Sequence, residues 1–197
     1  MAVVQMGLGW MQLVQKRLMA LLFVVLISLF VSMPEPPREI VLIDAAVNNP
    51  DFFLQQLQRH QRGILLSPHS TLASVTQELK HFKHLQAIHV ISHGAPGQFQ
   101  IGQTVVHQAQ LHADFASQRS SQFALLAQWG QVLATDGDIV LYGCEVAATP
   151  TGQDFLQPLH QVTQADIAAS TDRSGDPNNV QLAGNWQLEA TIGTVPQ

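Results

Sequence analysis

A short apolar run that ends on the only cysteine of the chain constrains the fold most. Residues 139–142 read Ile-Val-Leu-Tyr, preceded by an acidic turn at 136–138 and followed by Gly143 and Cys144. Four consecutive apolar residues between turn-forming residues are typical of a strand that is buried on both faces, as in a parallel sheet covered by helices. The run therefore predicts a buried strand with Cys144 at its carboxyl end.

An earlier apolar run has the same form. Residues 88–92 read Ile-His-Val-Ile-Ser and are followed by His93 and Gly94. In open α/β sheets, the loops at the carboxyl ends of the strands place side chains from several strands over one crevice. We therefore expect His93 and Cys144 to lie at the same edge of one sheet.

The remainder of the domain alternates between expected strands and expected helices. Strands are predicted at residues 38–44, 63–67, 88–94, 138–144, 165–170 and 184–190, and a small hairpin at 98–107. Helices are predicted to begin at Pro50 and Thr149 and to span residues 71–82 and 119–134. This alternation predicts an α/β fold with a mainly parallel five- to six-stranded sheet, right-handed crossovers and helices on both faces.

Residues 1–37 are expected to form a separate segment before a domain at 38–197. Lys16 and Arg17 precede sixteen residues without a charge, Leu18 to Met33, and a proline-rich spacer follows. A helix of this length spans roughly 24 Å, short of the ~30 Å hydrocarbon core of a bilayer. A signal peptide and a transmembrane signal anchor both fit, and the lack of a small-x-small cleavage site before Pro34 favours the anchor. Either predicts contact with the membrane and a domain on the periplasmic or extracellular side.

Composition excludes several classes of partner and site. The formal net charge is −5, and the domain has no cluster of lysine and arginine, so we expect no nucleic-acid partner. One cysteine cannot form an internal disulfide, an all-cysteine metal site or an all-cysteine redox motif. Four histidines, His81, His84, His89 and His93, lie close in sequence, but no carboxylate has a matching spacing. The sequence therefore predicts no metal and no cofactor.

The two strand ends carry the groups of a cysteine nucleophile. His93 would be the general base for Cys144, and the backbone N–H groups of Gly94 and Cys144 would stabilise an oxyanion. Glycine after the histidine lets a carbonyl approach the backbone closely. The alternative is structural, because a free cysteine is often simply buried and His-Gly often forms a turn.

Two aspartates follow other expected strands. Asp44 and Asp172 are predicted at the carboxyl ends of neighbouring strands, where they would line a substrate-binding pocket that favours a basic side chain. Aspartates at strand ends also accept hydrogen bonds from loop backbone, and that second interpretation remains open.

The two motifs together resemble those of known cysteine peptidases. An apolar strand ending in His-Gly, followed after a helix by one ending in Cys, is similar to the caspase-like superfamily, which includes caspases, gingipains, clostripain, separase and legumain. More specifically, five segments resemble an uncharacterised bacterial domain family found near the N-terminus of large secreted adhesins and cadherin-repeat proteins: residues 40–44 (IVLID), 89–94 (HVISHG), 140–147 (VLYGCEVA), 166–172 (DIAASTD) and 184–190 (GNWQLEA). The resemblance implies a caspase-like three-layer α-β-α sandwich and assigns the dyad to His93 and Cys144.

These observations lead to two main hypotheses. The first is an exported or membrane-anchored cysteine peptidase that acts on a polypeptide substrate. The alternative is a non-catalytic module of the same fold that serves surface display, secretion or binding of a protein partner. A redox-sensing thiol that bridges two chains is a third reading.

Overall fold

The structure is a computed structural model that describes residues 15–19, 21, 35–111, 121–175 and 184–196. The chain divides into two units, Met1–Pro36 and Pro37–Gln197. In the first unit residues 15–19 and 21 are helical, and most of the apolar stretch from Leu18 to Met33 lies outside the described residues. Within the ranges just given, no helix combines the length and the apolar character needed to cross a membrane.

The second unit is built on a six-stranded, mainly parallel sheet, which confirms the predicted α/β fold. The strand order is β2-β1-β3-β7-β8-β9, and only the β8–β9 pair is antiparallel. With helices packed against it, the sheet is compatible with a three-layer α/β sandwich. The strands are β1 (Glu39–Asp44), β2 (Gln61–Leu66), β3 (Leu85–Ile91), β7 (Leu133–Tyr142), β8 (Asp166–Ala169) and β9 (Ala190–Ile192).

One face of this sheet carries the main core. Three helices contribute apolar side chains to it: α3 (Leu72–Leu79), α5 (Ser121–Gly130) and α6 (Thr149–Thr163). Alternate strand residues supply the other half of the core, namely Ile40, Leu42, Ile88, Val90, Ile139, Leu141, Ile167 and Ala169. Trp129 of α5 is fully buried there, and its indole N–H donates to Thr76 Oγ1 at 2.8 Å. This face is therefore closed and almost wholly apolar.

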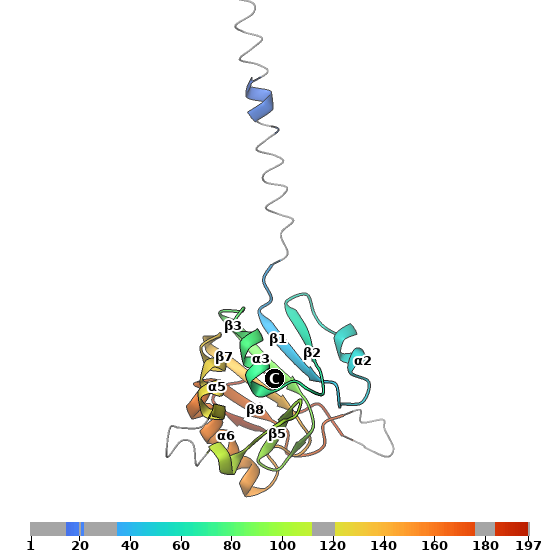
Figure 1. Cartoon of the computed structure of the whole chain (residues 1–197), viewed down its shortest axis with the longest axis vertical. Helices are drawn as coiled ribbons and strands as arrows, with labels where there is room; N and C mark the ends of the chain where they lie inside the picture. The colour runs from blue at the N-terminus through green and yellow to red at the C-terminus, as the bar shows by residue number, and fades with distance from the viewer. Residues whose placement is uncertain (1–14, 20, 22–34, 112–120, 176–183, 197) are drawn as a thin grey trace, which may run out of the picture. The chain divides into compact units, whose positions relative to one another are not determined.

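The opposite face is covered only in part. The short helix α2 (Pro50–Gln55) lies beside β2 at the edge of the sheet (Figure 1), where a Cβ on Gly63 would stand 2.5 Å from a Leu54 methyl group. Leu188 of the C-terminal segment packs against Val140 and Ala168. The described part of this C-terminal segment, residues 184–189, is largely irregular, and with α2 it covers this face of the sheet.

A second, three-stranded sheet lies near the carboxyl ends of the main strands. It consists of β4 (Gly94–Ala95), β5 (Gln98–Ile101) and β6 (Thr104–His107), and it extends the predicted hairpin by one strand. The Gly102 N–H donates to Asp44 Oδ2 at 2.7 Å, and the Gln100 N–H donates to the His93 carbonyl at 3.0 Å. These bonds fix the hairpin to the ends of β1 and β3.

The predicted helix over residues 119–134 was too long at its carboxyl end. Helix α5 ends at Gly130, and Leu133 already belongs to β7. The backbone of Gly130 lies against the carbonyl of Thr163, so close that a side chain would collide with it. The predicted turn at Asp136 and Gly137 is instead an irregularity within β7, between the pairs Leu85–Leu133 and Ala87–Asp138.

The predicted last strand at 184–190 was also misplaced. Strand β9 begins at Ala190, whereas the segment before it forms only an isolated bridge between Asn185 and Ser174. The alternating pattern has a different cause. Trp186 and Leu188 contact the partly covered sheet face, and Glu189 accepts a hydrogen bond from the Thr171 N–H at 2.8 Å.

Candidate functional site

The structure places the predicted histidine and cysteine at equivalent positions of two adjacent strands. Strands β3 and β7 pair in parallel, and their last register pair is Ile91 with Tyr142. His93 and Cys144 each follow two residues later. The two motifs therefore leave the sheet side by side at its carboxyl edge, as the sequence predicted.

The two strand ends touch through their backbones, and this contact requires glycine. A Cβ on Gly94 would lie 2.9 Å from the Cys144 carbonyl oxygen and 2.6 Å from Val146 Cγ2. A Cβ on Gly143 would lie 3.2 Å from the Gly94 Cα. Contacts this short leave no room for a side chain without displacement of its neighbours. Glycine at position 94 is thus explained first by the approach of the chain's own backbone.

His93 is solvent-exposed and held by one hydrogen bond. Its Nε2 lies 3.0 Å from the Ala46 carbonyl oxygen, in the loop after β1. A carbonyl oxygen only accepts, so Nε2 must carry the proton in this contact. In a neutral imidazole the other ring nitrogen, Nδ1, is then an acceptor. The Ala46 contact thus selects the tautomer that a general base needs.

The Cys144 thiol is half-buried in a turn that is fixed by the end of β8. The Glu145 N–H donates to the Asp172 carbonyl at 2.6 Å, and Glu145 has a φ of 60°. The thiol itself donates to the Ser174 carbonyl at 3.8 Å. In the described part of the chain, no hydrogen bond joins the thiol to His93, and the Cys144 N–H has no acceptor.

The structure does not bring Asp44 and Asp172 together as neighbours. Their strands, β1 and β8, are separated by β3 and β7, so the predicted adjacency was wrong. Asp44 is 1% exposed, and its carboxylate accepts from the N–H groups of Ala46 and Gly102 at 2.9 and 2.7 Å. Asp172 is exposed and accepts from Asn185 Nδ2 at 2.8 Å. Both carboxylates hold loops, and their role in substrate binding stays a prediction.

Sequence reasoning missed a cavity on the partly covered sheet face. It has a volume of about 710 Å³ and is lined by β1, β3, β7, β8 and the C-terminal segment. Its acidic residues are Glu39, Asp136, Asp138 and Asp166. The sequence did contain a signal for this cavity. Several strands that were expected to be buried on both faces carry a charged residue near their start.

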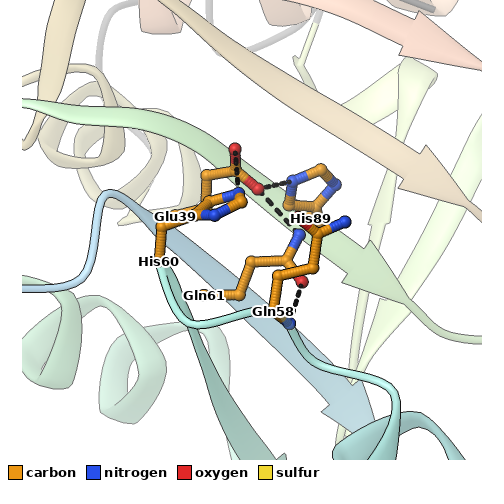
Figure 2. A network of polar contacts seen from close by, with 5 residues as sticks. All are labelled: Glu39, Gln58, His60, Gln61 and His89. Carbon is orange, nitrogen blue, oxygen red and sulfur yellow. Dashed lines mark hydrogen bonds and ion pairs between the residues drawn. The ribbon is translucent and has the colours of Figure 1, made fainter.

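A polar network fixes one side of this cavity (Figure 2). Glu39 Oε2 accepts from Gln61 Nε2 at 2.8 Å and contacts His89 Nε2 at 3.0 Å, and Glu39 Oε1 lies 3.3 Å from His60 Nε2. Burial acts to raise the pKa of Glu39, but hydrogen bonds from Gln61 and His89 and the charge of the two histidines outweigh it and lower the pKa. Burial lowers the pKa of His89 although Glu39 opposes this shift. This predicts an ionised carboxylate and a neutral His89 at pH 7.

The histidines that lie close in sequence do not form a metal centre in the described part of the chain. His89 contacts Glu39, and His93 contacts the Ala46 carbonyl. In the ranges that the structure describes, no three His, Cys, Asp or Glu side chains are arranged to hold a metal ion.

The fold and the carboxyl edge define a class of protein: an α/β domain whose adjacent parallel strands end in His-Gly and Gly-Cys. A family model for this class of sequence matches residues 40–197, which is the α/β domain from β1 onward. The chain belongs to this family, described as Domain of unknown function (DUF4347). No curated protein and no solved structure matches the chain significantly.

Proposed function

We propose that this domain is a cysteine-dependent hydrolase that cleaves polypeptides, with His93 as general base and Cys144 as nucleophile. The observation that carries the proposal is the shared position of the two residues, each two residues beyond the last register pair of β3 and β7. Paired strands provide the rigid support that a nucleophile and its base require. Hydrogen bonds between catalytic groups are often long in the absence of substrate, so the lack of a direct contact is compatible with this role.

The proposed reaction uses the side chains and backbone N–H groups at the carboxyl edge of the sheet. His93 Nδ1 takes the proton of the Cys144 thiol, and the thiolate attacks the carbonyl carbon of the substrate. The backbone N–H groups of Cys144 and Gly94 donate to the oxyanion. The imidazolium returns its proton to the leaving amine, which breaks the peptide bond and leaves a thioester. Water then adds with His93 as base, and the acid product and the free thiol are released.

The thiol has a second contact that competes with His93 for its proton. The S–H group is a weak donor and points to the Ser174 carbonyl, whereas His93 is held through Nε2, which leaves Nδ1 to accept the thiol proton. Proton transfer to His93 requires the thiol to turn away from Ser174, and a polypeptide bound along this edge would favour that turn. This same observation favours the second candidate function, a non-catalytic module that binds a protein partner.

The wider context forms part of the proposal. We infer a relationship to the caspase-like peptidases and to adhesin-associated domains from the sequence motifs. We also infer attachment to a membrane, or export, through residues 1–37, with the domain on the periplasmic or extracellular side. The basic pair at Lys16 and Arg17 and the uncharged stretch after it support this orientation.

The experiment that tests the proposal is alkylation of the full chain by iodoacetamide at pH 7. Cys144 is the only cysteine, so mass spectrometry reads one site. A working dyad gives faster alkylation than free cysteine, and His93→Ala should slow it about tenfold because few unassisted thiols are ionised at pH 7. His93→Gln retains a donor for the Ala46 carbonyl without a base, and it should be equally slow.

The matched control is His81→Ala, which removes an exposed histidine just after α3 and should leave the rate unchanged. Equal rates in the parent chain and in both His93 variants would overturn the hydrolase proposal and favour the binding module. If the dyad is confirmed, a dye-labelled casein should be cleaved by the parent chain and not by Cys144→Ser.

A further inference from the structure

A row of carboxylates crosses the partly covered face of the sheet, away from the His93–Cys144 edge. The register pairs Glu39 with Ala87, Ala87 with Asp138, and Asp138 with Asp166. These residues point to the same face and lie toward the same end of the sheet. The small side chain of Ala87 leaves open space in the middle of the row, and the cavity of about 710 Å³ lies over it.

The carboxylates of this row differ in how they are neutralised. Glu39 is held by Gln61, His60 and His89. Asp166 accepts a hydrogen bond from the Thr194 N–H at 2.8 Å. Asp138 faces Asp166 directly across the strand pair, and like charges in that position repel each other.

Asp138 is the least compensated member of the row. It is 7% exposed, and its Oδ1 is buried with no hydrogen-bond partner among the described residues. Burial and the nearby charges of Asp166, Asp136 and Glu39 raise its pKa to about 6. No lysine or arginine is among the described residues that line the cavity. A buried carboxylate in this position would be stabilised by a cation, and the described lining residues offer only two histidines, His84 and His89, as basic groups.

The walls of the cavity indicate what kind of cation fits. Val140, Leu188 and Val195 are apolar, and the Trp186 ring, which is 44% exposed, stands edge-on to Tyr142 at 6.1 Å. Aromatic and apolar walls suit the hydrocarbon stem of an amphipathic cation, and an aromatic face also attracts its charge. The volume lies within the range of small-molecule sites. An organic cation also fits better than a metal ion, because no described trio of ligands is arranged around one.

We propose that this cavity is a second binding site, for an aliphatic amine, with the ammonium group between Asp138, Asp166 and Asp136 and the hydrocarbon stem against Val140, Leu188 and Trp186. The amine is either a free alkylamine or the side chain of a lysine in a polypeptide. Both sources present the same group, so the site recognises the charge and the stem. It is independent of the proposed hydrolase chemistry.

Calorimetric titration of the full chain at pH 7.5 tests this site. The probes are n-pentylamine, its neutral analogue 1-pentanol and lysine blocked at its α-amino and carboxyl groups. We expect saturable binding of pentylamine and binding of pentanol at least about tenfold weaker, because a charged hydrogen bond is lost. Blocked lysine binding as tightly as pentylamine would identify a polypeptide side chain as the source, and weaker binding would identify a free amine.

Substitutions distinguish the site from non-specific charge attraction. Asp138→Asn should weaken pentylamine binding about tenfold, and Asp136→Asn, at an exposed position, about threefold. Asp154→Asn removes an exposed carboxylate from α6, which packs on the other face, and should have no effect. A circular dichroism melt confirms that each variant is folded.

Three kinds of result would overturn the proposal. The first is the absence of saturable pentylamine binding to the parent chain. The second is equal binding of pentylamine and pentanol, or unchanged amine affinity in folded Asp138→Asn. The third is binding of Mg²⁺ that depends on Asp138 when the amine does not bind, which would indicate a metal site.

Discussion

The two faces of the central sheet are built from the same strands but differ in what their side chains do. On the helix-covered face, alternate residues such as Ile139 and Leu141 are buried and apolar in β1, β3, β7 and β8. On the other face, the intervening residues of the same strand are Asp138, Val140 and Tyr142. The helix-covered face therefore supplies most of the stability of the domain, and the partly covered face retains a buried carboxylate, Asp138, that opposes it. A charged row that lowers stability indicates a function for the surface that carries it.

The largest difference in stability should be seen between substitutions of the two tryptophans of the domain. Trp129 is fully buried on the helix-covered face, whereas Trp186 is 44% exposed at the open one. Trp129→Ala should lower the free energy of unfolding by about 3–5 kcal/mol, because it creates a cavity and leaves Thr76 without its donor. Urea denaturation measures the difference.

Trp186→Ala is the matched control and should cost less than about 1 kcal/mol. Trp129→Phe offers a milder variant if the alanine variant does not fold, and it should still cost more than Trp186→Ala. Equal losses at the two positions would contradict the assignment of stability to the helix-covered face.

Removal of the Asp138 charge should increase the stability of the domain. The pKa of Asp138 is raised by burial first and then by its acidic neighbours, so its folded value of about 6 exceeds the ordinary value of 3.8. The folded state then holds the proton more tightly, and stability falls as the pH rises from about 4 to 6. Asp138→Asn should therefore stabilise the domain by about 2 kcal/mol at pH 7.

The pH dependence separates this cause from a change in packing. Below pH 4 the Asp138 carboxyl becomes protonated in both states, and the advantage of Asp138→Asn should vanish. Asp154→Asn, on the other face, should show neither effect. Thermal unfolding followed at pH 3.5, 5.5 and 7.5 measures all three proteins. A gain that is the same at every pH would contradict the electrostatic explanation.

A substitution at the carboxyl edge of the sheet should have an intermediate effect on stability. In Gly94→Ala the new methyl group would meet Val146 and the Cys144 carbonyl at 2.6 and 2.9 Å. We expect a loss of about 1–3 kcal/mol from overpacking and a changed alkylation rate at Cys144, since both strand ends must shift. Pro96→Ala, at a nearby exposed position, should cost less than about 1 kcal/mol and leave the alkylation rate unchanged. Full retention of stability in Gly94→Ala would show that the two loops are not in contact.

The core and the carboxyl edge were predictable from sequence, and the cavity was not. Apolar runs ending at His93 and Cys144 require buried parallel strands, and parallel strands bring their ends to one edge whatever their order. The order itself is not encoded locally, which is why Asp44 and Asp172 were expected on neighbouring strands. The cavity depends on register, because Asp138 and Asp166 meet only when their strands are aligned. Trp186 was assigned to a strand because alternation of apolar residues does not tell a strand from a segment that covers one.

The smallest change in stability should come from the network around Glu39. On this part of the partly covered face, neighbouring side chains compensate the charge of the carboxylate. Its pKa is lowered because hydrogen bonds from Gln61 and His89 and the charges of His89 and His60 outweigh the larger single effect of burial. The resulting stabilisation is present above the ordinary value of 4.5 and is lost as the pH falls below it.

Glu39→Gln should cost less than about 1 kcal/mol at pH 7, because the neighbours are partly exposed and the substitution also relieves repulsion on Asp138. Glu78→Gln, an exposed position on α3, is the control in urea denaturation. If Glu39→Gln lowered the free energy of unfolding as much as Trp129→Ala, the partly covered face would contribute to stability as strongly as the helix-covered face.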